Sequence, residues 1–413
     1  MEEIERLTKE LQLENDKKTA SDPSIQTSLR VVEEFLKHHP VMCYGGTAIN
    51  NLLPKKDRFY NPEFDIPDYD FFSKTPQEHA TIIANQLAEK GIANIEVKAG
   101  MHLGTFKVFA NYEGVADITF LEEDLFDRLW KEDVVLEGIH YVTPNFLRMS
   151  MYLELSRPRG DVSRWTKVYG RLELLNKHYP ATCRVTKAVT KAVAKENKEM
   201  SDEKKAEYMK LLKSEPVVLL GVTAAEIHLH AKWTTPIMLL ADKEVIDRLT
   251  SGMKTKLDEA TEILPPRTSV LDDSGKAIVR FYETTACHSY HSQNGIRVAS
   301  IPTILQFFFA YIYTDAHDSN VASVLCIAQE LVELANSKPK RRFAILTPKD
   351  CIGTQETLVD MKRHKAELYS KLSKNRSSPE FIKYFFTYNP NTTKTQRAKV
   401  REQLRKTKKK RMQ

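Results

Sequence analysis

The feature that most restricts how this chain folds is a pair of aspartates one residue apart, Asp68 and Asp70, in the stretch IPDYDFF. Alternate residues of a strand point to one face, so the two carboxylates share a face and the aromatic residue after each points to the core. Pro67 marks the expected start of the strand, which favours this pair over the nearby Asp65. Strands disfavour aspartate, so two on one face of an aromatic strand indicate a functional site.

A glycine pair precedes these aspartates. The stretch VMCYGGTAINNLL predicts a short apolar strand, a turn at Gly45 and Gly46, and a short helix that Pro54 ends. Glycines at such a turn allow backbone N–H groups and a helix N-terminus to approach a phosphate. Turns of this kind are common, so the glycines alone do not indicate a nucleotide site.

A third carboxylate, Asp117, lies in the apolar stretch VADITFL, where a lone acid is equally out of place. This stretch and TFKVFA before it alternate in hydrophobicity and are joined by NYEG, which predicts a hairpin. Three carboxylates on neighbouring strands form a hard-oxygen site suited to Mg²⁺ or Mn²⁺. Two such ions can activate an attacking hydroxyl and stabilise a departing pyrophosphate. The alternative is three ordinary strand-edge acids in contact with lysine or arginine.

Other phosphate-binding and hydrolase motifs do not occur in the sequence. It contains no GxxxxGK[ST], GxGxxG, HExxH or GxSxG. This argues against a Walker-type nucleotide site, a dinucleotide fold, a zinc protease of the HExxH type and a nucleophile-elbow hydrolase.

The glycine turn, the acid pair and the later carboxylate together resemble the DNA polymerase β-like nucleotidyltransferases. Within that superfamily, YGGTAIN, IPDYDFFS and VADIT are most similar to the poly(A) polymerase catalytic subunits of large cytoplasmic DNA viruses. The resemblance covers about residues 41–180 and continues, less closely, through residues 283–313. The chain departs from the pattern in the length of the loop before Asp68 and in Gly46, where many relatives have serine.

The resemblance implies a role for each matching position. Asp68 and Asp70 would hold two metal ions, Mg²⁺ or Mn²⁺, and Asp117 would hold the ion that activates the RNA 3′-hydroxyl. Gly45 and Gly46 would contact the triphosphate of the substrate ATP through backbone N–H groups.

The segment RGDVSRWTKVYGR, residues 159–171, lies where relatives place a helix that closes over the nucleotide. Lys167 is the first candidate for a phosphate contact and Arg164 the second, since either cation can neutralise charge on a leaving pyrophosphate. For both residues, the alternative is a solvated helix face.

The charge of the chain is concentrated at its end. The net charge is +7, but residues 393–413 alone contain ten Lys or Arg and one acid, Glu402, so the rest is close to neutral. A polycationic tail favours a polyanionic partner such as RNA. A nuclear-type targeting signal and a solubility tail are the alternatives.

The five cysteines are scattered and form no CxxC pair, which predicts reduced thiols and neither a disulfide framework nor a structural zinc site. The charged N-terminus is unlike a signal peptide, and the most apolar stretch, residues 299–314, is too short to span a bilayer. We therefore expect a soluble intracellular protein with no membrane partner. The resemblance implies the cytoplasm of a virus-infected host, with packaging in the virion as a further implication.

The pattern of elements predicts an α/β (α+β) fold with a mixed-sheet nucleotidyltransferase domain. The expected parts are an N-terminal helical segment (1–39), a catalytic domain (40–185), a helical linker (186–214), a C-terminal α/β domain (215–392) and the basic tail (393–413). The C-terminal domain is expected to be a second nucleotidyltransferase-like unit without the carboxylates, because it contains no Gly-Gly turn followed by Asp-x-Asp.

The functional hypothesis is a template-independent polynucleotide adenylyltransferase that adds AMP from ATP to RNA 3′ ends. The resemblance also implies a homodimer or a processivity subunit as partner. Two alternatives remain: a nucleotidyltransferase of other base specificity, uridylyl or CCA-adding, and a non-catalytic RNA-binding scaffold subunit.

Overall fold

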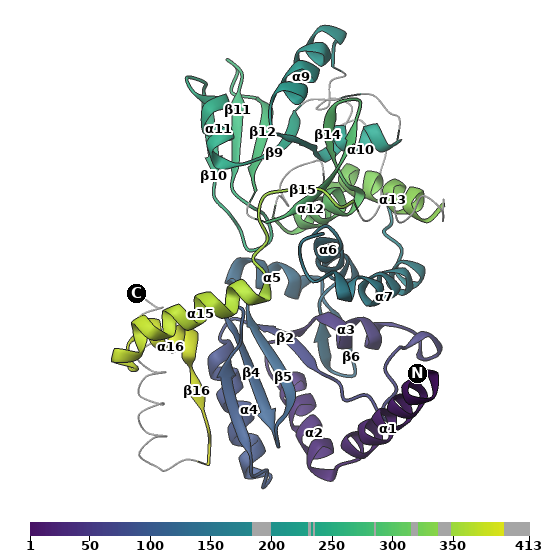
Figure 1. Cartoon of the computed structure of the whole chain (residues 1–413), viewed down its shortest axis with the longest axis vertical. Helices are drawn as coiled ribbons and strands as arrows, with labels where there is room; N and C mark the ends of the chain where they lie inside the picture. The colour runs from purple at the N-terminus through teal and green to yellow at the C-terminus, as the bar shows by residue number, and fades with distance from the viewer. Residues whose placement is uncertain are drawn as a thin grey trace. The chain divides into compact units, whose positions relative to one another are not determined.

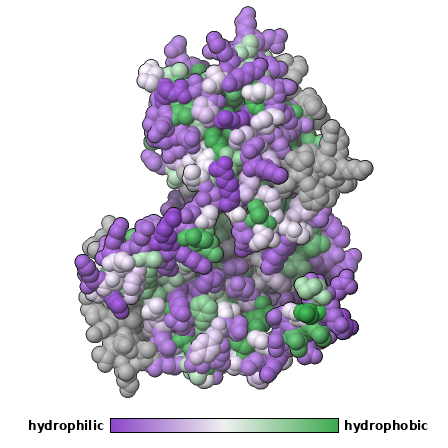
Figure 2. Space-filling view, viewed as in Figure 1, coloured by the Kyte–Doolittle hydropathy of each residue, from purple (hydrophilic) through white to green (hydrophobic). Residues whose placement is uncertain are grey.

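A computed structural model describes residues 1–183, 200–229, 233, 236–284, 286–314, 321–337 and 348–391 (Figure 1). The basic tail and residues 186–199 of the expected linker lie outside these ranges. The chain forms two compact units, Met1–Thr143 with Leu358–Gln413 and Pro144–Thr357. Both units carry mostly hydrophilic residues on the face seen in Figure 2, with hydrophobic residues scattered between them.

The first unit contains a mixed sheet whose described strands run in the order β16-β3-β4-β5-β2-β1-β7-β6. Their bounds are β1 Met42–Cys43, β2 Tyr69–Ser73, β3 Ile95–Ala99, β4 Thr105–Ala110, β5 Glu113–Phe120, β6 Val134–Leu136, β7 Ile139–Tyr141 and β16 Thr387–Tyr388. The central strand β2 lies parallel to β5 and antiparallel to β1. The predicted hairpin over TFKVFA and VADITFL is confirmed as β4 and β5.

Nine helical segments accompany this sheet among the described residues. Their bounds are α1 Glu2–Ala20, α2 Pro23–His38, α3 Gly45–Leu52, η1 Lys55–Asp57, α4 Pro76–Glu89, α5 Glu123–Lys131, α15 Leu358–Leu372, η3 Ser373–Asn375 and α16 Pro379–Phe385. In α2 the Asp22 side chain caps the first turn and Pro23 occupies the first helical position. Its apolar stripe, including Val32, Phe35 and Leu36, is buried.

The second unit contains another mixed sheet, in the described order β10-β11-β12-β9-β8-β14-β13-β15. The strands are β8 Val218–Leu220, β9 Ile237–Ala241, β10 Thr255–Asp258, β11 Arg267–Leu271, β12 Ala277–Glu283, β13 His288–Gln293, β14 Ile296–Ala299 and β15 Cys351–Ile352. The helices are α6 Pro144–Leu155, η2 Val162–Arg164, α7 Trp165–His178, α9 Asp202–Ser214, α10 Gly221–Leu229, α11 Lys243–Thr250, α12 Ile301–Thr314 and α13 Val321–Ser337. Almost every residue of α12 is buried, so this helix forms the core of the unit.

The two sheets repeat one topology. Strands β1 to β7 and strands β8 to β14 follow each other in the same chain order and take the same places in their sheets. The directions also agree, since β2–β5 and β9–β12 are parallel pairs and β1–β2 and β8–β9 are antiparallel pairs. Seven strands of the second sheet therefore repeat the arrangement of seven strands of the first.

The structure divides the chain differently from the expected boundaries. Residues 144–183, expected in the catalytic domain, lie in the second unit, because α6 packs on α12. Residues 358–391 return to the first unit, where β16 pairs with β3 through Tyr388 and Val97. Both changes depend on contacts between segments far apart in the sequence.

Two stretches of the second unit differ from what their sequence suggests. IHLHAKW alternates as a strand does, but its residues 227–229 end helix α10. A turn is expected between His288 and His291, but both lie in strand β13, and the turn that follows it contains Asn294 and Gly295. Short runs of this kind do not distinguish a buried strand from a buried helix by periodicity, which explains the first difference.

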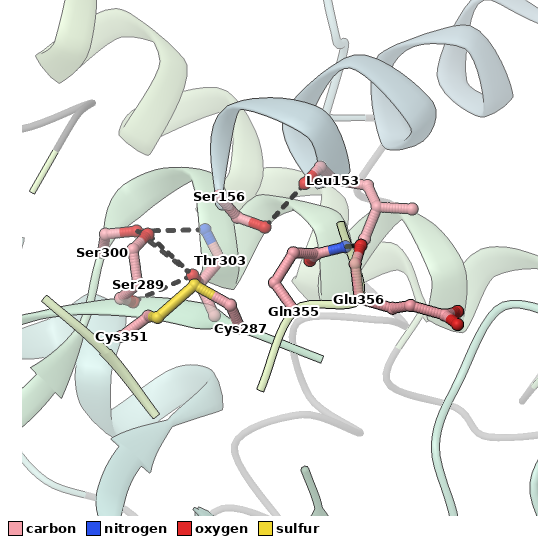
Figure 3. Close-up of a disulfide and its surroundings, with 9 residues drawn as sticks. All are labelled: Leu153, Ser156, Cys287, Ser289, Ser300, Thr303, Cys351, Gln355 and Glu356. Carbon is pink, nitrogen blue, oxygen red and sulfur yellow. Dashed lines mark hydrogen bonds between the residues drawn. A yellow bond between two sulfur atoms is a disulfide. The ribbon is translucent and has the colours of Figure 1, made fainter. Parts of the chain in front are cut away.

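The prediction of reduced thiols is also wrong. Disulfides join Cys183 to Cys326 and Cys287 to Cys351, and the remaining cysteine, Cys43, is buried. The partners are 143 and 64 residues apart, so the cysteine spacing carries no sign of the pairing. Figure 3 shows the bond between Cys287 and Cys351 beside a hydrogen-bonded group of Ser289, Ser300 and Thr303.

No helix among the described residues is both long enough and apolar enough to cross a membrane.

Candidate active site

Three carboxylates meet at one end of the central strands in the first unit. Asp70 on β2 is paired with Asp117 on the parallel strand β5, so their side chains lie side by side on one face. Asp68 is exposed and comes directly before β2. One ligand oxygen from each of the three lies within 4.8 Å of the others. The structure thus brings together the three acids predicted from the sequence.

The glycine turn holds this end of β2 against β1. Gly45 has a φ of +71°, which glycine adopts more readily than any other residue. The N–H of Tyr44 donates to the carbonyl oxygen of Asp70 at 2.9 Å, and the Thr47 hydroxyl donates to that of Asp68 at 2.7 Å. A Cβ atom at Gly45 would lie 2.5 Å from Asp70 Oδ2, so only glycine leaves room for the carboxylate.

Gly46 follows in the first turn of α3, whose N-terminal N–H groups are those that a helix leaves unpaired. These N–H groups lie next to Gly45, the residue that packs closely against Asp70. The contact of Gly45 and Gly46 with a triphosphate stays a prediction.

Side chains behind β2 support the cluster. The Tyr69 hydroxyl points away from the aspartates and donates to Glu33 Oε1 on α2 at 2.6 Å. Burial and this neighbouring carboxylate raise the pKa of Tyr69 above its ordinary value, so the phenol keeps its proton. Asp65 plays a different part, because its carboxylate accepts from the N–H of Asn61 at 2.7 Å and closes a turn.

Lys107 is a site residue that the sequence analysis missed. It lies on β4 directly opposite Asp117, and its ammonium contacts Asp117 Oδ2. The alternation of TFKVFA on the predicted hairpin could have placed this lysine on the carboxylate face. At Asp117 the structure therefore also fits the alternative interpretation, in which an acid pairs with a basic residue, because Lys107 contacts this carboxylate.

An aromatic and hydroxyl surface continues from the carboxylates along the same strands. The ring of Tyr44 stacks on Phe72 at 4.0 Å, and its hydroxyl lies 2.9 Å from Thr119 Oγ1. Thr119 in turn lies 3.0 Å from Thr105 Oγ1 on β4. Burial and the nearby Asp70 raise the pKa of Tyr44, so this hydroxyl is neutral at physiological pH.

The donor set fits a divalent cation. All three ligands are carboxylates, which Mg²⁺ and Mn²⁺ prefer over nitrogen or sulfur donors. Asp68 is exposed and Asp70 and Asp117 are half-buried, so an ion can enter from solvent.

The two predicted phosphate-binding cations lie in the second unit. Arg164 precedes α7, and its Nε atom is 2.7 Å from Glu154 Oε1. Lys167 is exposed on the first turn of α7. Their role in binding phosphate stays a prediction.

Comparison with known proteins agrees with this site. Residues 30–161 match the family model described as poly(A) polymerase catalytic subunit. A protein assigned as a poly(A) polymerase catalytic subunit in African swine fever virus (isolate Pig/Kenya/KEN-50/1950) is 31% identical over 175 residues, which cover 41% of this chain and 36% of that protein. The corresponding protein of Acanthamoeba polyphaga mimivirus is 29% identical over 156 residues, or 37% of this chain and 26% of that protein. The match thus spans between about a quarter and about a third of the length of these curated relatives.

The fold agrees over almost the whole chain with a solved structure, the Megavirus polyadenylate synthase. The TM-score is 0.77 at 20% identity, over 98% of this chain and 89% of that one. This likeness confirms the predicted nucleotidyltransferase fold class. Residues 30–161, which contain the glycine turn and all three carboxylates, match the model of the poly(A) polymerase catalytic subunit family, and they are similar to the viral proteins that the sequence motifs resemble.

Proposed function

We propose that the chain is a polynucleotide adenylyltransferase that adds AMP from ATP to RNA 3′ ends. The observation that carries the proposal is the cluster of Asp68, Asp70 and Asp117, with one oxygen of each within 4.8 Å, inside the region that matches the poly(A) polymerase family. An inactive scaffold would have no need to keep three carboxylates this close together, because like charges repel each other.

Phosphoryl transfer requires mainly positioning and charge compensation. Two divalent ions bound by the carboxylates would supply activation of the 3′-hydroxyl and stabilisation of the leaving pyrophosphate. The chain's own residues prepare this site: the Gly45 turn aligns Asp70, the register of β2 and β5 sets Asp117 beside it, and Lys107 balances charge at Asp117. Lys167 and Arg164 are proposed to neutralise the phosphates of ATP.

The rivals differ in the base added or in the absence of chemistry. A uridylyl or CCA-adding enzyme would use the same carboxylates, so the cluster does not distinguish it from an adenylyltransferase. The name of the family and of the matched relatives favours adenylate. A non-catalytic RNA-binding subunit would bind RNA without extending it.

Primer extension with each nucleoside triphosphate in turn, in Mg²⁺ or Mn²⁺, tests the proposal. We expect extension with ATP, no extension with EDTA, and slower use of the other three triphosphates. Preferred incorporation of UMP or CMP would replace the adenylyltransferase by one of its rivals, and a lack of any metal-dependent extension would leave the scaffold as the better account.

The partners and location are proposed on the same basis. RNA and ATP follow from the reaction, and a second copy of the chain or a processivity subunit follows from the family resemblance. The cytoplasm of an infected cell, with packaging in the virion, is the location that this resemblance implies.

A further inference from the structure

A groove of about 510 Å³ lies on the first unit, apart from the carboxylate cluster. Its walls come from β3, α15, the residues that follow η3, α16 and β16. The lining residues that matter for the argument are Lys98, Lys365, Tyr369, Arg376, Tyr384 and Phe385. A volume of this size lies within the range of about 300–1,000 Å³ that small-molecule sites occupy, enough for a nucleotide unit.

Aromatic rings form one wall of the groove. Tyr369 meets Phe385 edge to face at 5.2 Å and Phe381 at 5.9 Å, and Phe381 lies 5.1 Å from Phe385. Tyr369 remains 41% exposed although it takes part in this cluster, and Tyr384 is half-exposed beside it. An exposed ring that packs against other aromatic rings offers a rigid face on which a nucleic-acid base can stack.

Basic side chains lie over the same rings. The Arg376 guanidinium donates to the Tyr369 hydroxyl at 3.1 Å and lies 5.9 Å from its ring centre. Lys383 Nζ lies 5.9 Å from the Tyr384 ring, and Lys365 Nζ lies 5.7 Å from Phe385. Lys365 also donates to the carbonyl oxygens of Ala99 and Gly100, so it fixes α15 to the end of β3.

The charge around the groove is positive. The described segment 358–391 contains seven Lys or Arg and three acids. The lining holds three cations and, among the residues that the structure describes, no carboxylate. Of these cations only Lys98 is paired with an acid of the described chain, since its Nζ lies 2.7 Å from Glu96. Such a surface attracts an anionic polymer.

From the groove, the chain runs along β3 to the other end of that strand and then continues into its polycationic end. After β16, the Asn391 side chain donates to the carbonyl oxygen of Ala93 at 2.6 Å, next to β3. The sequence beyond then carries ten Lys or Arg within residues 393–413. Two segments that each hold more cations than acids thus follow one another in the sequence.

We propose that this groove is a second binding site for single-stranded RNA, in which bases stack on Tyr369 and Tyr384 and phosphates contact Arg376 and Lys383. The proposal rests on the proposed function, because it takes RNA to be the substrate that the groove retains. The pattern is that of sequence-tolerant single-strand binding, where aromatic platforms alternate with backbone-tracking cations. The chain's own basic tail does not suit the groove, since like charges repel.

Equilibrium binding of the full chain to a long fluorescent single-stranded RNA tests the groove. Arg376→Glu should weaken binding several-fold at low salt and reduce the salt slope by about 0.7 for each phosphate that the variant no longer neutralises. Tyr369→Ala should weaken binding about tenfold, and Tyr369→Phe should bind almost normally because it keeps the ring. Photocrosslinked RNA should map to peptides from residues 365–388.

The matched control is Arg30→Glu on α2. Arg30 is likewise an exposed arginine that donates to a hydroxyl, that of Thr27, and its reversal changes the net charge equally. The groove variants must lose more affinity than this control. Equal loss in Arg376→Glu and Arg30→Glu, or unchanged binding in Tyr369→Ala, would overturn the RNA site and favour a protein partner at the groove.

Two readouts separate this proposal from the proposed function. Single AMP addition to a saturating short primer depends on the carboxylates and should be unchanged in the groove variants. If the wild-type chain adds no nucleotide, the enzymatic proposal fails while RNA binding still tests the groove. If addition is normal and the groove variants bind like the wild type, only the groove proposal fails.

Discussion

The two sheets share a topology but differ at the positions that would carry chemistry. By strand register, Met238 on β9 takes the place of Asp70, and Arg280 on β12 takes the place of Asp117. Ser269 stands opposite Arg280 as Lys107 stands opposite Asp117. The second unit thus keeps the framework and replaces both strand carboxylates, one by a thioether and one by a cation.

The glycine turn survives in both units. Gly221 follows β8 with a φ of +70°, as Gly45 follows β1 with a φ of +71°. A Cβ at Gly221 would meet the Met238 side chain, just as one at Gly45 would meet Asp70. Because this turn also occurs in the unit without carboxylates, its glycine has a structural role. In both units a residue with positive φ joins the strand to the helix that follows it. The acids, and not the glycine, mark the unit proposed to be catalytic.

The largest effect expected from this comparison is on the carboxylates. Asp68→Asn, Asp70→Asn and Asp117→Asn should each lower the rate of AMP addition by about a thousandfold or more, since each removes charge from the metal site. Met238→Leu in the second unit should leave the rate unchanged. Single-turnover extension, with thermal unfolding to verify the fold, measures both.

The control within the first unit is Asp65→Asn, which changes a turn outside the cluster and should have a mild effect. Near-normal turnover in Asp117→Asn would remove Asp117 from the site. A strong loss in Met238→Leu would mean that the sheet of the second unit takes part in the chemistry.

Both disulfides lie in the second unit, so reduction should destabilise the second unit and leave the first unit unchanged. Without reductant, a thiol assay on unfolded chain should find one free cysteine, Cys43, and five after reduction. The double change Cys287→Ser with Cys351→Ser should lower stability by up to about 4 kcal/mol for a loop of 64 residues, measured by denaturant unfolding. Five thiols before reduction would show that the bonds do not form in solution.

Alanine at the two turn glycines sharpens the comparison further. Gly45→Ala and Gly221→Ala should each destabilise the protein by about 1–2 kcal/mol, because alanine is strained at positive φ. Only Gly45→Ala should also slow AMP addition, since its Cβ would displace Asp70. Paired measurements of unfolding and turnover decide this. Equal turnover in the two variants would contradict a site held by Gly45.

The second unit is predicted to assist the reaction through α7. Lys167→Ala should raise KM for ATP or lower kcat by about tenfold, since a cation placed near a leaving group contributes a few kcal/mol at most. Lys167→Arg should recover only part, because a guanidinium does not occupy the place of an ammonium. Steady-state kinetics with varied ATP measure this. Normal kinetics in Lys167→Ala would move the role to Arg164, whose partner Glu154 must then be tested by Glu154→Gln.

The smallest effect expected is on acid stability. Burial lowers the pKa of His288 in the second unit to about 3 and that of His79 in the first to about 4, from 6.5. Both are neutral when folded and take up protons when unfolded, so stability is full above pH 6.5 and falls as the pH drops towards these values.

His288→Leu should remove one of these losses, about 1 kcal/mol at about pH 5.5, and flatten the pH dependence of unfolding. Neither ring nitrogen of His288 has a hydrogen-bond partner among the described residues, so no bond is lost in this variant. His79 remains as the internal reference. An unchanged pH profile would mean that His288 is hydrated in solution.

The sequence by itself determined the local parts of the site. Alternation identified the shared face of Asp68 and Asp70, glycines and prolines placed the turns, and the apolar hairpin placed Asp117. Ser201, a typical N-cap residue before a helical stretch, likewise accepts from the N–H of Lys204 at the start of α9. Each of these depends on residues a few positions apart, where backbone period and capping act directly.

Only the tertiary structure decided what joins distant segments. It set Asp70 beside Asp117 across a parallel pair, added β16 to β3 and paired the cysteines. It also revealed the second sheet as a copy, although its strands carry few of the same residues. Parallel pairing and disulfides depend on loop closure and packing over tens of residues, and these leave no period in the sequence.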